Sequence, residues 1–166
     1  KGGANPISSP FPKILLPINS LSTPVGSAVW KAKHVVLDDK TYIVVIDMMG
    51  SVYAYNAADI FTVTGPTLTA TGSWDVPPSN FDKQSNNAFA LDIDKIPGED
   101  AFAYVYIGVK RIGIEVLKLN SDGTLVHEEF IPVWDSPFGL KLTGTYPNRR
   151  MIVADKIGGI REFKTS

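Results

Sequence analysis

The sequence lacks cysteine altogether and contains only 2 histidines among its 166 residues. Without cysteine, the chain can form no disulfide, no thiolate zinc site and no cysteine nucleophile. With two histidines, one chain cannot build a multi-histidine metal centre. The missing cysteines leave the compartment open, because many secreted bacterial and fungal proteins also lack cysteine. We expect an extracellular or secreted location.

Several other signals are missing. No apolar run approaches the roughly 18 residues that a membrane-spanning helix needs, so we expect no transmembrane segment. The formal net charge is -1 and no basic cluster stands out, which argues against a nucleic-acid partner. There is no Gly-x-Ser-x-Gly elbow, no phosphate-binding glycine loop and no His-Glu-x-x-His pair. The sequence therefore leaves open whether the protein is an enzyme. Because it begins with Lys1 rather than Met, we expect a processed form or a fragment.

Short strand-like runs dominate what is present. Hydrophobic residues make up 44% of the chain and charged residues 20%, which suits one globular domain with a sizeable core. The central part holds four such runs with turn signals between them, and this pattern predicts an all-β sandwich, barrel or propeller. The four runs are Ala88–Ile93, Ala101–Val109, Gly113–Leu119 and Thr124–Ile131.

A weak internal repeat favours the propeller among these folds. Each unit reads as a buried strand, a glycine-containing hairpin and an alternating strand, which is the order of a propeller blade. We predict one domain over residues 1–166, with an extended arm at 1–12, a possible ring-closing strand at 13–21 and blade-like repeats at 28–76, 86–132 and 136–166. The alternative is a β-trefoil, which also has three four-stranded repeats in about this length.

Three blades cannot close a ring with normal sheet twist. Terminal blades of an open array expose an apolar face, and this chain has no polar cap because Ile157, Ile160 and Phe163 lie almost at its end. We therefore expect a second protein chain to complete the propeller, either an identical copy or the remainder of a longer propeller.

The apolar runs also predict which strands are deepest. Tyr42–Met48, Ala101–Val109 and Met151–Asp155 show no two-sided alternation, so we predict that they are the three most buried strands. The segments Asp59–Gly65 and Pro77–Gln84 read as surface loops, and loops of repeat proteins often carry function. The predicted ligand or partner contacts on or near them are Phe61, Trp74 and Phe81.

Carboxylates give the remaining candidates. Asp92 lies in an acidic cluster with Asp94, Glu99 and Asp100, and calcium prefers several oxygen ligands, so Asp92 with Asn86 and Asn87 is a candidate metal site set against a plain solvated turn. Asp47 and Asp155 end corresponding strands and are predicted to accept hydrogen bonds from backbone N–H groups of the following turns. His34 shares a face with Trp30 and Val36 and is predicted to lie in the core.

Part of the chain resembles known propeller families. Residues 136–163 are similar to a blade of the six-bladed gluconolactonase and strictosidine synthase-like propellers, through Pro137, Gly139, Leu140, Val153, Ala154, Asp155, Gly158 and Gly159. The middle block, with its Phe-Ala-Tyr run, is similar to blades of the yellow and royal-jelly proteins. In the hydrolase branch, this resemblance implies a central divalent metal held by carboxylate and asparagine ligands. One such position maps to Asp92, and the asparagine position is Phe138 here.

Two functions follow as hypotheses. The first is a β-propeller binding or assembly module that contacts a partner chain or a small ligand through its loops and blade edges. The second is a metal-dependent lactonase or esterase of the gluconolactonase type, for which the resemblance implies Ca²⁺ near Asp92. The first hypothesis needs no cofactor.

Overall fold

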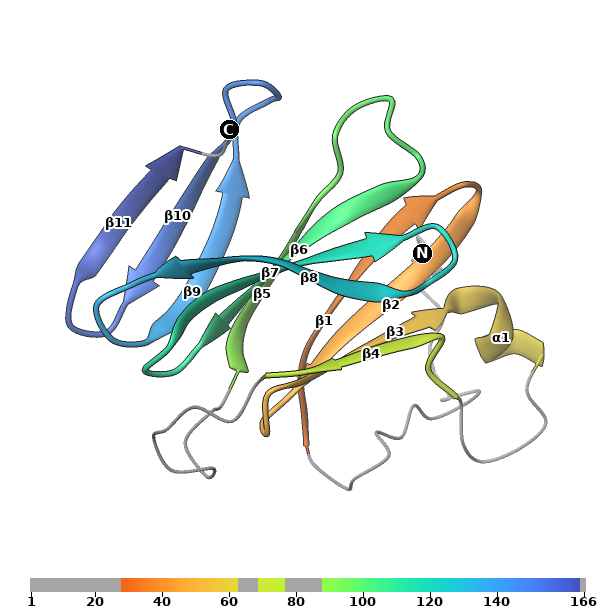
Figure 1. Ribbon diagram of the computed structural model, residues 1–166, viewed down its shortest axis with the longest axis horizontal. Helices are drawn as coiled ribbons and strands as arrows, with labels where there is room; N and C mark the ends of the chain where they lie inside the picture. The colour runs from red at the N-terminus through yellow and green to blue at the C-terminus, as the bar shows by residue number, and fades with distance from the viewer. Residues whose placement is uncertain (1–27, 63–68, 77–87, 165–166) are drawn as a thin grey trace, which may run out of the picture.

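The computed structural model describes residues 28–62, 69–76 and 88–164. For residues 60–62 it describes the backbone but not the side chains. Within these residues the chain forms eleven strands and one short helix, arranged as three separate antiparallel sheets (Figure 1). We call them the first, second and third blades in chain order. No helix in this part of the chain is both long and apolar enough to cross a membrane.

The first blade is a meander of four strands in the order β1-β2-β3-β4. The hairpin between its first two strands turns through Asp38 and Asp39, both with positive φ, which matches the two-residue turns that suit strand twist. A short helix, α1, occupies part of the segment predicted as a loop at Asp59–Gly65, so that prediction was wrong in part. The elements are β1 Val29–Leu37, β2 Lys40–Asp47, β3 Ser51–Asn56, α1 Ala57–Thr62 and β4 Gly72–Asp75.

The second blade repeats this meander with the order β5-β6-β7-β8, and the third has the order β11-β10-β9 in the residues described. The second blade consists of β5 Ala88–Asp94, β6 Phe102–Val109, β7 Gly113–Asn120 and β8 Leu125–Pro132. The third blade consists of β9 Pro137–Thr143, β10 Arg150–Asp155 and β11 Gly159–Lys164. The predicted ring-closing strand at 13–21 and the predicted loop Pro77–Gln84 lie outside the described residues.

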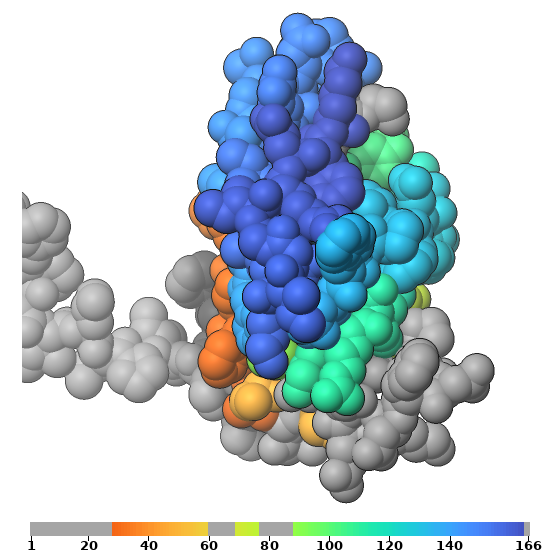
Figure 2. Space-filling view, turned by 90° about the vertical axis from the view of Figure 1, so that its left-hand side faces the viewer, coloured from red at the N-terminus to blue at the C-terminus, as the bar shows by residue number. Residues whose placement is uncertain are grey.

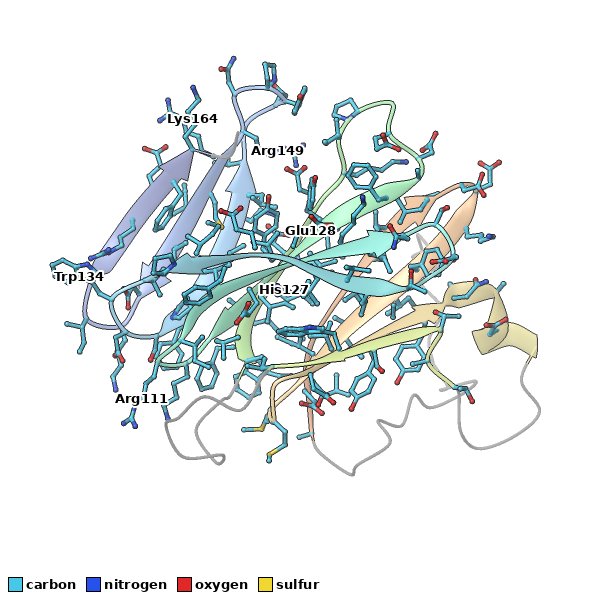
Figure 3. The ribbon with its side chains drawn as sticks, viewed as in Figure 1. Arg111, His127, Glu128, Trp134, Arg149 and Lys164 are labelled. Carbon is cyan, nitrogen blue, oxygen red and sulfur yellow. The ribbon has the colours of Figure 1, made fainter. Side chains whose placement is uncertain are left out.

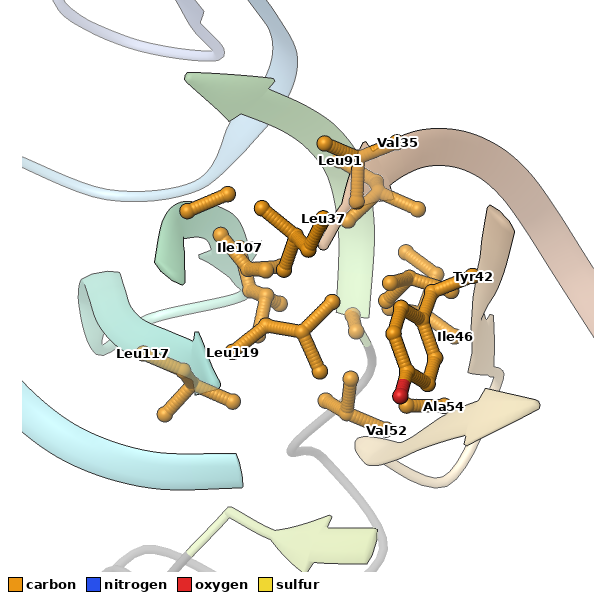
Figure 4. Packing of buried hydrophobic residues seen from close by; sticks show 14 of the residues in the cluster. Val35, Leu37, Tyr42, Ile46, Val52, Ala54, Leu91, Ile107, Leu117 and Leu119 are labelled. Atoms are coloured by element: carbon orange, nitrogen blue, oxygen red, sulfur yellow. The ribbon is translucent and has the colours of Figure 1, made fainter. Parts of the chain in front are cut away.

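The three blades pack face to face in chain order. One apolar cluster joins the first and second blades, and Figure 4 shows part of it, including Leu37 and Ile46 of the first blade and Ile107 and Leu119 of the second. A second cluster joins the second and third blades. Three stacked sheets are consecutive blades of a propeller, so the predicted all-β propeller architecture is confirmed, and the trefoil alternative is wrong because the strands do not form one closed barrel.

Burial differs among the three strands predicted to be deepest. β2 and β6 are largely buried on both faces, as predicted. β10 instead alternates strictly: Met151 and Val153 are buried, whereas Ile152 is 38% exposed. β7 is more buried than β10. The prediction for β10 was wrong because only one face of the third blade has a neighbouring blade in the described structure.

Candidate functional site

The first strands of the three blades lie side by side, with β5 next to both β1 and β9. In a propeller, the first strand of each blade borders the central channel. Each of these strands carries a β-bulge at the same place relative to its partner strand. The unpaired residue is aromatic in every case: Trp30 in β1, Phe89 in β5 and Phe138 in β9.

The bulges bring these three side chains together, and we call them the aromatic layer. The ring centroids of Phe89 and Phe138 are 4.6 Å apart in a stacked arrangement, and Trp30 meets Phe89 edge-on at 6.2 Å. Trp30 is 48% and Phe138 43% exposed. A bulge re-aims one side chain of a strand, so the repeated bulge explains how three strands present aromatic rings to one another. The alternation pattern had assigned Trp30 to a face with His34, but it gave no signal of a bulge.

Three residues further along each strand, a charged layer follows, made of Lys33, Asp92 and Lys141. The Nζ atom of Lys33 lies 3.3 Å from Oδ1 of Asp92, and the Nζ atom of Lys141 lies 3.4 Å from Oδ2. Asp92 is buried, and its oxygens also accept hydrogen bonds from the backbone N–H groups of Ile93 at 3.2 Å and Leu142 at 2.8 Å. One carboxylate thus connects all three blades.

These contacts control the charge of Asp92. Burial acts to raise the pKa of the carboxyl group, but the hydrogen bond from Leu142 and the interaction with Lys33 outweigh it, and the pKa lies below its ordinary value. The two lysine ammonium groups also occupy the space beside both oxygens, where a cation would be repelled. Asn86 and Asn87, the other predicted metal ligands, lie outside the described residues. The described members of the predicted calcium site therefore do not fit a calcium ion.

The rest of the acidic cluster is also paired. Asp94 forms a salt bridge with Arg149, which links the second blade to the third. Burial raises the pKa of Asp94 despite the opposing effect of Arg149. Asp100 pairs with Lys95, and Glu99 accepts a hydrogen bond from a backbone N–H group at 2.8 Å. Within the described residues, no group of three or more His, Cys, Asp or Glu side chains has the arrangement of a metal site.

The two strand-end carboxylates bind backbone N–H groups, but in different places. Asp47 Oδ1 accepts hydrogen bonds from Met49 and Ser51, both at 2.9 Å, and so fixes the turn that follows its strand. Asp155 instead accepts hydrogen bonds from Trp134 and Ser136, each at 3.0 Å, in the connection that enters the third blade. The repeat correctly predicted that Asp47 and Asp155 hold equivalent positions in their blades. It did not predict that Asp155 binds the segment before β9 rather than the turn after β10.

The predicted aromatic contacts are placed differently. Trp74 in β4 is half-buried and stacks on the ring of His127 in β8, with 5.7 Å between centroids, so it joins the first blade to the second. The Nε2 atom of His127 in turn lies 2.7 Å from Oε2 of the buried Glu115. The side chains of Phe61 and Phe81 lie outside the described residues. His34, predicted in the core, is exposed, because its side of β1 faces away from the second blade.

The most informative surface is the side of the third blade that faces away from the second, which we call the forward face. Repeat equivalence identifies it: Val52, Ile114 and Ile160 hold the same register position in the three blades. Val52 and Ile114 are 0% exposed because the next blade covers them, whereas Ile160 is 81% exposed. The blue strands in Figure 2 present this uncovered face toward the viewer.

The same comparison holds in the middle strands of the blades. Val44 is fully buried and Tyr106 nearly so, whereas their equivalent, Ile152, is 38% exposed. Ala154, beside Ile160 in the sheet, is exposed too. Charged side chains border this apolar strip, among them the exposed pair Arg150 and Glu162, 2.8 Å apart. The third blade therefore carries the side-chain pattern of a covered blade face without a covering blade among the described residues.

Comparison with solved structures agrees with this description. A crystal structure of BBS1N in complex with ARL6DN, soaked with lead, contains a similar β-propeller-type chain, with a TM-score of 0.61 and 18% sequence identity over 83% of this chain and 42% of that one. At this identity the likeness shows the fold alone. No family model matches the chain, and no curated protein matches it either.

The fold thus defines the class: this is a β-propeller-type protein of which the described residues form three consecutive blades. The chain spans less than half of the BBS1N chain that it matches. The finer resemblance to gluconolactonase-like or royal-jelly-like blades is not accompanied by a family match.

Proposed function

We propose that this chain is an assembly module of a larger β-propeller, and that the forward face of its third blade binds a further blade. The observation that carries the proposal is the contrast among equivalent residues: Val52 and Ile114 are 0% exposed and Ile160 is 81% exposed. Removing apolar surface from water is the main driving force of such packing, and a contiguous exposed apolar face marks an interaction site.

The remaining blades of a longer propeller fit this role better than an identical copy. In a ring of identical copies, the forward face of the third blade would pack on the backward face of the first. On that backward face Val45, Tyr53 and Tyr55 are already buried, with exposures of 1%, 4% and 1%. Among the described residues, the two middle strands of the first blade therefore offer no exposed apolar strip like that of the third blade. The partial coverage of the BBS1N chain supports the same arrangement.

The hydrolase alternative has less support in the described residues. Its metal would need Asp92, whose oxygens already interact with two lysines and two backbone N–H groups. The wall of the channel is instead lined by the aromatic layer, which suits the binding of apolar groups better than the binding of an ion. An extracellular location remains part of the proposal, and fractionation of the native source would test it.

Native mass spectrometry and light scattering test the assembly proposal. The isolated chain, of 18.0 kDa, is expected to self-associate reversibly through its exposed face, and Ile152→Asp with Ile160→Asp is expected to abolish this association. Ile157→Asp is the matched control, because Ile157 is 74% exposed but lies in the turn between β10 and β11. A monodisperse, stable monomer in dilute buffer would refute the proposal. A discrete, closed dimer would instead assign the covering blade to an identical copy.

A further inference from the structure

The third blade differs from the other two at its outer edge. The first and second blades each have a fourth strand, β4 and β8, whereas among the described residues the third blade ends with β11, which pairs only with β10. The fourth strands of neighbouring blades touch, as the stacking of Trp74 on His127 shows. A fourth strand in the third blade would correspondingly lie against the forward side of β8.

A cleft of about 490 Å³ occupies this place, between β8 of the second blade and β10 and β11 of the third. Its lining is mixed, with aliphatic and aromatic side chains beside charged ones. Burial raises the pKa of Tyr106 in one wall to about 12, with Asp94 adding to the effect. The apolar lining consists of Tyr104, Tyr106, Val116, Ile131, Met151 and Phe163. Among the described residues, the cleft is therefore bordered by a strand edge without a backbone partner, and aliphatic and aromatic side chains form much of its floor.

The rim of the cleft on the β8 side is acidic. Glu128 and Glu129 are adjacent and exposed, and neither forms an ion pair with a described residue. Two consecutive residues reach the same rim because β8 bulges between His127 and Glu129. Lys164 of β11 is on the other side (Figure 3). In the part of the chain that the structure describes, the two carboxylates thus have no ion-pair partner, and Lys164 lines the opposite side of the same cleft.

We propose that β11 and this cleft bind an extended segment of a partner protein that alternates lysine or arginine with β-branched residues. The segment adds to the free edge of β11 as the fourth strand of the third blade, and its backbone completes the sheet. Every second side chain then points toward β8, because side chains alternate in a strand. A lysine or arginine there lays its aliphatic stem on Tyr106 and Ile131 and places its charge beside Glu128 and Glu129.

This site is the edge of the third blade, not its forward face, so it does not rest on the assembly proposal. A polar or acidic segment would leave the two glutamates without a partner, and a wholly apolar one would bury them. The alternating basic segment satisfies the strand edge, the apolar floor and the acidic rim together.

The test uses the full chain and a fluorescently labelled seven-residue peptide of alternating lysine and valine, followed by fluorescence polarisation at low salt. Two control peptides accompany it: one with glutamate in place of lysine, and one with N-methyl groups on the amides of one edge, which cannot extend the sheet. We expect the lysine–valine peptide to bind, the controls to fail, and added salt to weaken binding.

Charge-reversal variants identify the rim. Glu128→Lys with Glu129→Lys is expected to weaken binding at least about tenfold, which corresponds to two modest rim charge interactions. Asp75→Lys, an exposed carboxylate of β4 in the first blade, is the matched control and is expected to change binding less than about twofold. Three results would each overturn the proposal: the N-methylated peptide binds as tightly as the lysine–valine peptide, the protein with Glu128→Lys and Glu129→Lys binds that peptide as tightly as wild type, or the peptide does not bind at ~1 mM.

Discussion

Truncating equivalent isoleucines in the second and third blades tests the blade register directly. Ile114→Ala removes three carbon atoms from a side chain that is 0% exposed at the contact between the second and third blades. At about 0.8 kcal/mol per buried carbon, the transfer term is about 2.4 kcal/mol. The cavity left behind adds to it, so we expect a loss of about 3–4 kcal/mol in the free energy of unfolding.

Ile160→Ala makes the same chemical change at the equivalent position of the third blade. Because Ile160 is 81% exposed, the monomer, at a protein concentration low enough to prevent self-association, is expected to lose no more than about 0.5 kcal/mol. Val52→Ala, fully buried between the first and second blades, is a further control, with an expected loss of about 1.6 kcal/mol from transfer alone. Urea unfolding at constant protein concentration, followed by fluorescence and circular dichroism, measures all three.

The contrast between the two isoleucines is what the reasoning depends on. A loss of stability from Ile160→Ala as large as that from Ile114→Ala, measured in the monomer, would show that another part of the chain covers the forward face. The assembly proposal would then lose its main support. A small effect of Ile114→Ala would show that the second and third blades are not packed as described.

Four further outcomes are expected. The folded pKa of Asp92 is depressed, so the stability that its carboxylate contributes is present above its unfolded pKa and is lost as the pH falls through its folded pKa. Asp92→Asn cannot make this contribution. In urea titrations between about pH 5 and 2, the variant should therefore lose less stability than wild type. The folded pKa of Asp94 is raised, so its protonation favours folding, and Asp94→Asn should show the opposite sign, with a greater loss than wild type as the pH falls. The pKa of about 12 for Tyr106 predicts a late-ionising phenol in an ultraviolet alkaline titration, and Tyr106→Phe should remove its contribution. Gly72→Ala places a Cβ atom 2.2 Å from the backbone oxygen of Gly123, and thermal unfolding should show a large loss of stability, of about 2 kcal/mol or more.

Sequence reasoning located the repeats because their signal is local. Alternation, glycine-containing hairpins and apolar runs depend on residues close together in the chain, and they predicted β2, β6, β9 and the three-blade order. They also predicted exposed apolar side chains near Ile157 and Ile160, which the structure shows. The same reasoning failed for β10, where an apolar run lies in a strand with one exposed face.

The candidate sites were less predictable, because they join residues from different blades. The charged layer needs Lys33, Asp92 and Lys141 at one register, and nothing local distinguishes a carboxylate between two lysines from a metal ligand. Trp74 was predicted as a partner contact because it lies near a predicted surface loop, and loops of repeat proteins often carry function. Only the packing of the first blade on the second shows that its ring stacks on His127.

The sequence by itself therefore determined the strands, the hairpins and the repeat, since backbone conformation and side-chain alternation are set by neighbouring residues. Only the tertiary structure decided which apolar faces are covered. Burial at Ile114 and exposure at Ile160 arise from similar local sequences, and the difference comes from the presence of a neighbouring blade on one and not on the other. The aromatic layer likewise required three bulges on three strands to coincide in space.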